Sequence, residues 1–69
     1  MKTFIGIVIK KFDGRVTGFF PDYVITLFAN KRQYDVYQST NKKNLKKLKV
    51  GQQVKFKFSE LYPDEVTIL

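Results

Sequence analysis

Apolar and lysine side chains alternate strictly over residues 54–58, and this is the clearest pattern in the chain. A period of two is typical of a β-strand with one buried face and one solvent-facing side. The apolar residues and lysines of this segment are Val54, Phe56, Phe58, Lys55 and Lys57. Residues 49–52 include Gly51, which tolerates a positive φ, and predict a tight turn. We therefore expect a turn followed by a strand with a dry face and a cationic face.

Other segments rich in β-branched and aromatic residues predict further strands between turn signals. They cover residues 4–12, 15–20, 23–28, 34–38 and 65–69. Asp13-Gly14 predicts a two-residue hairpin after the first strand, and Pro21-Asp22 predicts the next turn. The polar residues 29–33 predict a loop, so the strands on either side of it should pair. Gly6 indicates a bulge or a close backbone approach in the first strand.

Residues 39–49 break the strand pattern. Leu45 and Leu48 are three positions apart, a spacing that lets one helical turn face a core. Ser39, Thr40 or Asn41 could cap such a turn. The lysines that follow, at positions 42 and 43, oppose the helix dipole. We expect no more than a turn or two of helix here.

Five or six short strands with one short helical segment before the penultimate strand predict an all-β barrel. A closed barrel is expected because closure removes exposed sheet edges. A small five-stranded OB-type barrel fits best, and an SH3-like barrel is the alternative. The 69 residues should form a single domain, residues 1–69. The expected core residues are Val8, Val16, Phe20, Val36, Val54, Phe56 and Phe58.

Composition narrows the chemistry. The chain has neither cysteine nor histidine, which excludes disulfides, thiolate metal sites and a histidine base. Its six acids are scattered and suggest no acid–base pair, so we expect no enzyme activity, cofactor or metal. The net charge of +7 predicts an anionic partner. No apolar run is long enough to span a membrane, and residues 4–9 are interpreted as a strand rather than a signal peptide, so we expect a cytoplasmic protein.

Four stretches of the chain resemble the cold-shock domain, a small OB-fold family that binds single-stranded nucleic acid. They are Gly6-Ile7-Val8 with Phe12, Arg15-Val16-Thr17-Gly18-Phe19-Phe20, Asp35-Val36-Tyr37, and residues 48–56. The second and third are similar to the two RNA-binding motifs of the family. The chain differs from the family at three places where an aromatic residue or a histidine is usual: it has Lys10 or Lys11, Thr17 and Ser39 there. S1-type OB domains are more distantly similar.

The resemblance and the charge pattern together predict a basic face with stacking aromatic rings. The expected phosphate contacts are Lys10, Lys11, Arg15, Lys55 and Lys57. The expected base-stacking residues are Phe19 and Tyr37. The secondary candidates are Phe12, Tyr23, Lys31, Arg32 and Tyr34. Arg15 and Phe19 should share the outer face of the strand at residues 15–20.

Two other partners stay open at this point. A small regulatory protein could dock on an acidic surface of a protein partner, which the departures from the family motifs favour. A ribosome- or duplex-binding accessory protein would use its lysines alone. The leading hypothesis is a module for single-stranded DNA or RNA with weak sequence preference, and we expect a monomer.

Overall fold

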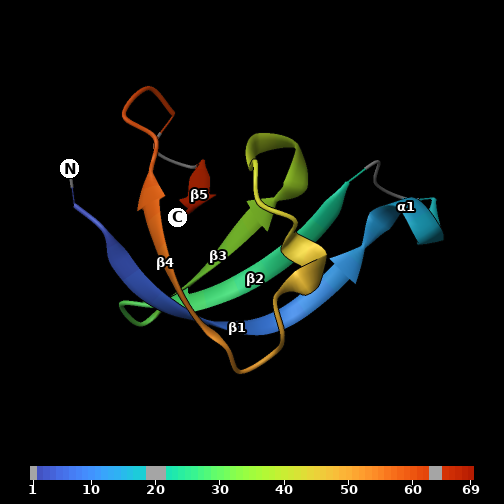
Figure 1. The fold of residues 1–69 in the computed structure, drawn as a ribbon, viewed down its shortest axis with the longest axis horizontal. Helices are drawn as coiled ribbons and strands as arrows, with labels where there is room; N and C mark the ends of the chain where they lie inside the picture. Colours follow the sequence, from blue (N-terminus) through green and yellow to red (C-terminus); the bar gives the residue numbers. More distant parts are fainter. Residues whose placement is uncertain (1, 19–21, 63–64) are drawn as a thin grey trace.

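Five antiparallel strands form one sheet that curls into a half-barrel (Figure 1). The computed structural model describes residues 2–18, 22–62 and 65–69. The strands are β1 (Phe4–Asp13), β2 (Tyr23–Ala29), β3 (Arg32–Tyr37), β4 (Gln53–Phe58) and β5 (Val66–Ile68). Their order in the sheet is β3-β2-β1-β4-β5, so β1 is central and β3 and β5 are the edges. This confirms the expected all-β barrel with little helix.

A β-bulge divides the central strand into two halves. In β1, Val8 pairs with Leu27 and Lys10 pairs with Thr26, so Ile9 is the extra residue. A bulge of one residue changes which side chains face the core. Gly6 and Val8 are buried before the bulge, whereas Lys10 and Phe12 are exposed after it. Lys10 and Lys11 therefore lie on opposite faces of the sheet.

The core fills the concave side of the sheet. It comprises Val8, Tyr23, Ile25, Leu27, Ala29, Val36, Leu45, Val54, Phe56, Val66 and Ile68. The predicted core positions in β1, β3 and β4 are confirmed, with Phe58 partly buried against the cluster. Phe4, Tyr34 and Phe58 surround the Phe56 ring at centroid distances of 5.6–5.8 Å. Gly6 lets β1 approach this ring closely, because an added Cβ would lie 3.0 Å from Phe56 Cε1.

The segment expected as a strand over residues 15–20 is instead a helical turn, α1 (Gly14–Thr17). Asp13 caps the turn by accepting a hydrogen bond from the Arg15 N–H at 3.0 Å, so Asp13-Gly14 is not a hairpin. Gly18 ends the turn with φ 75°. Val16 is 82% exposed, so its prediction as a core residue is wrong. Phe19 and Phe20 lie outside the described residues.

The β2–β3 connection is shorter than the loop expected over residues 29–33. Only Asn30 and Lys31 separate the strands, and both have positive φ, 52° and 62°. Two consecutive positive φ values match the right-handed twist of a hairpin. The predicted turn before β4 is confirmed, with Gly51 at φ 92° and a hydrogen bond from Gln52 N–H to Lys49 O.

Two 3₁₀ turns occupy the segment between β3 and β4, namely η1 (Gln38–Thr40) and η2 (Leu45–Lys47). Leu45 is buried, as its spacing predicted, and Leu48 is partly buried. The cap of η2 is Asn44, whose side chain accepts a hydrogen bond from Lys46 N–H. None of the three residues expected to cap this segment does so: η1 has no side-chain cap.

The buried Asn41 joins the two edges of the sheet. Its Nδ2 donates to the carbonyl oxygens of Tyr37, at the end of β3, and Val66, in β5, at 2.8 and 3.1 Å. Its Oδ1 accepts from the N–H of Ile68 at 2.7 Å. The side-chain amide thus occupies the place of a neighbouring strand along the free edge of β5.

Candidate nucleic-acid interface

Three side chains form a row across the outer face of β1, β2 and β3. Phe12 lies opposite Val24, and Val24 lies opposite Tyr37, in adjacent strands. The buried residues of β2 alternate with Val24 and Thr26, which places this row on the convex side of the sheet, away from the core. Phe12 is 39% exposed, and Val24 and Tyr37 are partly exposed. We call these three residues the outer row.

A shallow pocket, which we call the outer pocket, surrounds the outer row. Its lining consists of Lys10, Phe12, Val24, Thr26, Asp35 and Tyr37, and its volume is about 260 Å³. The Thr26 hydroxyl donates to Asp35 Oδ1 at 3.2 Å, so the carboxylate is held in the pocket by a neighbouring strand. A carboxylate repels phosphate but accepts hydrogen bonds from the amino groups of bases. The pocket therefore suits a planar, uncharged ring, with Lys10 available for a phosphate beside it.

The opposite end of the same outer face is apolar. Ile7 lies opposite Phe28, and Ile5 lies opposite Lys55. Ile5, Ile7 and Phe28 are 60, 40 and 45% exposed. Exposed apolar side chains that adjoin one another on a sheet mark a contact surface more often than isolated ones do. We call these three residues the apolar patch; Lys55 borders it.

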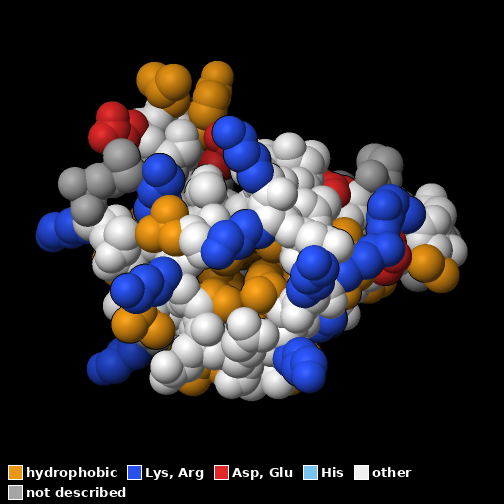
Figure 2. Space-filling model, in the orientation of Figure 1, with side chains coloured by type: hydrophobic (Ala, Val, Ile, Leu, Met, Phe, Trp, Pro, Cys, Tyr) orange, Lys and Arg blue, Asp and Glu red, His pale blue; other side chains and the backbone are white. Residues whose placement is uncertain are grey.

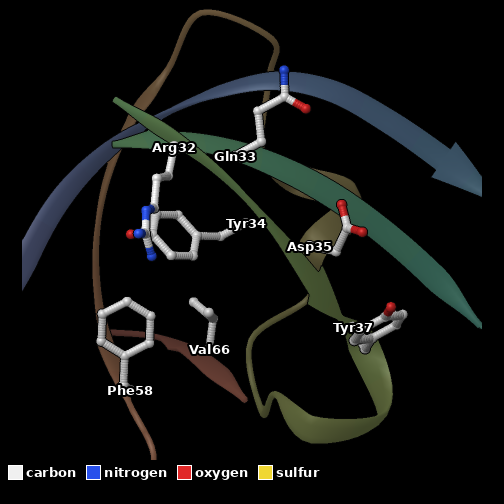
Figure 3. Close-up of a pocket in the computed structure, with 7 residues that line it drawn as sticks. All are labelled: Arg32, Gln33, Tyr34, Asp35, Tyr37, Phe58 and Val66. Carbon is white, nitrogen blue, oxygen red and sulfur yellow. The ribbon is translucent and has the colours of Figure 1, made fainter. Parts of the chain in front are cut away.

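The open edge of β3 borders a second pocket of about 650 Å³ (Figure 3). Figure 3 shows Arg32 and Tyr34 of β3 on the same side as Phe58 of β4 and Val66 of β5, with Asp35 and Tyr37 farther along the strand. The Tyr34 and Phe58 ring centroids are 5.3 Å apart. That spacing leaves no room for a base between them, so both rings serve the core more than a ligand.

A third pocket, on the core side of the sheet end, is cationic. We call it the cationic pocket, and its lining is Arg15, Tyr23, Gln38, Lys42, Asn44 and Lys46, with a volume of about 320 Å³. The Tyr23 ring is buried beneath the ammonium groups of Lys11 and Lys46, at 6.0 and 5.8 Å from its centroid. Tyr23 is therefore not an exposed stacking ring, but part of the floor that positions these lysines.

Two carboxylates share this end of the molecule. The guanidinium of Arg15 donates to Asp13 at 3.2 Å, which lowers the pKa of Asp13 and raises that of Arg15. Lys46 Nζ lies 3.9 Å from the same carboxylate. Partial burial disfavours the charge on Asp22, but hydrogen bonds from Ser39 and from the Tyr23 N–H outweigh it and lower the pKa of Asp22. Both acids are therefore ionised at neutral pH.

The predicted site residues fall into separate groups. Lys10, Phe12 and Tyr37 meet at the outer row. Lys55 borders the apolar patch. Arg15, Tyr23 and Lys11 meet at the cationic pocket. Lys57 is partly buried in β4, while Lys31 and Arg32 are exposed at the β2–β3 turn and Tyr34 packs against the aromatic core cluster. Figure 2 shows Lys and Arg side chains spread over the face that carries β4, η2 and α1, with few acids among them. Phe19 lies outside the described residues.

Sequence reasoning missed several pocket residues. Val24, Thr26 and Asp35 belong to the outer pocket, and Gln38, Lys42, Asn44 and Lys46 belong to the cationic pocket. The signal for the first group was present: the alternation in residues 23–28 places 24 and 26 opposite the core. The second group had no local signal for a pocket, because its residues come together only through the contacts that α1, η1 and η2 each make with β2 in the folded chain.

Within the described residues, no cluster of acids could hold a metal ion. The helices in that part of the chain are too short and too polar to cross a membrane. No family model matches the chain, and no curated protein or solved structure shows significant similarity to it.

Proposed function

We propose that the chain is a non-catalytic module that binds single-stranded DNA or RNA on the outer face of its sheet. The outer row carries this proposal. Single strands are bound by a basic surface together with rings on which successive bases stack. Phe12 and Tyr37 are two strands apart, roughly 10 Å at the usual strand spacing, so each ring can accept a separate base.

The charged residues around the row fit the same function. Lys10 lies in the outer pocket, and Lys55 lies farther along the same face, so each can contact a phosphate of a strand laid over the sheet. Phosphate contacts and stacking read little sequence, and we therefore expect weak base preference. The strand order, with 3₁₀ turns between β3 and β4, fits a partly open OB barrel.

The test separates stacking from charge. Phe12→Ala or Tyr37→Ala should weaken oligonucleotide binding by ~1–3 kcal/mol with an unchanged salt slope, because stacking releases few ions. Tyr62→Ala is the matched control, since Tyr62 is 64% exposed on the β4–β5 loop, away from the outer row. Titrations would be followed by fluorescence anisotropy, after melting curves confirm that each variant is folded.

Lysine variants supply the second measurement. Lys10→Ala and Lys55→Ala should each flatten the plot of log affinity against log salt by up to ~0.7, the counterion release per single-strand contact. Lys47→Ala, in η2, removes the same charge away from the outer row and should change the slope less. Parental affinity in both Phe12→Ala and Tyr37→Ala would refute the proposed surface.

One observation favours a second function, docking on an acidic protein surface. The apolar patch has Lys55 at its border, an arrangement that suits a protein partner whose surface has an apolar centre and an acidic rim. Phe28→Ser separates the two functions, because it lies outside the outer pocket. If Phe28→Ser binds oligonucleotide as tightly as the parent, the patch does not contact nucleic acid and is available to a protein partner. If its oligonucleotide affinity falls, the patch is part of the nucleic-acid surface.

A further inference from the structure

The cationic pocket holds more positive charge than its own acids neutralise. Arg15, Lys42 and Lys46 line it, and Lys11 lies beside them over the Tyr23 ring. The nearby acids are Asp13, shared by Arg15 and Lys46, and Asp22, which is held by Ser39 and Tyr23. Four cations against two carboxylates leave two positive charges.

Lys42 is the cation that the fold itself does not use. Among the described residues, Arg15 and Lys46 both pair with Asp13, and Lys11 Nζ donates to the Lys46 carbonyl oxygen at 3.0 Å, whereas Lys42 takes part in neither ion pair nor in such a bond. It is exposed at the mouth of the pocket. An exposed lysine at the mouth of a pocket that other cations line can pair with an anionic ligand without giving up an existing ion pair.

The loop that carries Lys42 is fixed by side-chain hydrogen bonds. Gln38 Oε1 accepts from the Leu45 N–H at 2.8 Å, and Gln38 Nε2 donates to the carbonyls of Asn41 and Lys43 at 3.0 and 2.7 Å. Asn44 caps η2 at 3.1 Å. These bonds hold residues 38–47 in one arrangement, so the lysines need little reordering to meet a ligand.

The ligand must be small and doubly charged. A phosphodiester would neutralise one of the two surplus charges, whereas a phosphomonoester near neutral pH carries close to two and neutralises both. A volume of about 320 Å³ accommodates a phosphate group, and the mixture of guanidinium and ammonium donors suits its oxygens.

Chain neighbours connect the cationic pocket to the outer row. Asp13 follows Phe12, Tyr23 precedes Val24, and Gln38 follows Tyr37, so each outer-row residue has a chain neighbour at or beside the cationic pocket. We infer that the cationic pocket binds a terminal phosphate of the nucleic acid whose bases lie on the outer row. The inference rests on the proposed function and names the end group of its ligand.

The experiment compares oligonucleotides of one sequence that carry a 5′-phosphate, a 3′-phosphate or hydroxyls at both ends. A hydroxyl-ended strand one nucleotide longer controls for added charge. One of the two phosphorylated strands should bind about three- to tenfold more tightly than both hydroxyl-ended strands. Which end gives the gain identifies the polarity of the bound strand.

Lys42→Ala should abolish this gain and leave the affinity for hydroxyl-ended strands within about twofold of the parent. Lys47→Ala removes the same charge outside the pocket and should keep the gain. Equal binding of all end groups by the parent, or a gain that survives in Lys42→Ala, would overturn the inference while leaving the proposed function intact.

A further arm uses inorganic phosphate alone, with chloride at equal ionic strength as control, and follows the amide signals of Asn44 and Lys46 by NMR. Selective shifts in the parent that are lost in Lys42→Ala support the pocket. If these shifts occur but no oligonucleotide binds, the pocket stands as a phosphate site and the proposed function is wrong.

Discussion

Replacing Asn41 should separate β3 from β5, the two edge strands that its side chain joins. In Asn41→Ala, three backbone groups lose a partner: the carbonyls of Tyr37 and Val66 and the N–H of Ile68. Leaving a buried polar group unsatisfied costs ~1–3 kcal/mol, and water entering the vacated space would recover part of that. We expect a loss of about 3 kcal/mol in the free energy of unfolding. A chain of this length has roughly 3–10 kcal/mol in total, so the variant should be near its limit of stability.

The local effect is more specific than the global one. β5 has three residues and pairs with β4 on one side only, and on its other side the Asn41 amide makes hydrogen bonds to Val66 and Ile68. The Ile68 amide should exchange slowly with solvent in the parent. In Asn41→Ala it should exchange faster than the β1 amides, because β5 can detach without the rest of the sheet unfolding.

Urea unfolding followed by circular dichroism gives the global loss, and hydrogen exchange by NMR gives the local one. Asn44→Ala is the control, since Asn44 is exposed and caps only η2; it should cost about 1 kcal/mol or less. Asn41→Asp keeps the acceptor for Ile68 but sets a carboxylate against two carbonyls, and should be at least as harmful as Asn41→Ala. A loss in Asn41→Ala no larger than that of Asn44→Ala would refute the bridging role.

Two further predictions concern packing and pH. Gly6→Ala should cost ~1–3 kcal/mol in urea unfolding, because the new methyl would lie 3.0 Å from the Phe56 ring; a variant as stable as the parent would mean that the ring moves freely. The pKa of Asp22 is lower in the folded protein than the value of about 3.9 expected for the unfolded chain. The ionised carboxylate therefore contributes its full share to the free energy of unfolding above about pH 3.9, and this contribution is lost as the pH falls through the folded pKa. Thermal melts should therefore show the parent more stable than Asp22→Asn at pH 6, with the gap narrowing below pH 4; a constant gap would contradict this.

The strand content could be predicted because its signals are local. In β4 the alternation of lysine with Val54 and Phe56 separates core from solvent without help from the rest of the chain. The helical turn α1 was missed although its signals were equally local: Asp13 is a good N-cap residue and Gly18 a good terminator. The β-prone composition of residues 15–20 was given more weight than these caps.

The arrangement of the candidate site was beyond local reasoning. Gly6 indicates a bulge or a close approach in β1, but nothing in its near-continuous apolar run places the bulge at Ile9. That bulge sets Lys10 beside Phe12 and Lys11 on the other face. Tyr37 and Phe12 come together only because β2 lies between their strands. The lysines of residues 42–47 look like a solvated loop in the sequence. The approach of Lys42 and Lys46 to Arg15 depends on how α1 and η2 each contact β2 in three dimensions.

The central position of β1 also affects how the chain assembles during synthesis. Its first half pairs with β4, and the partner of Phe4 is Phe56, so this ladder cannot form until most of the chain has been made. The β2–β3 hairpin needs only its two-residue turn and should form first. In the interval, residues 4–9 present an uncharged, β-prone edge of the kind that pairs with other chains. Lys2, Lys10 and Lys11 flank this segment, and their charges would keep nascent chains apart until β4 covers it.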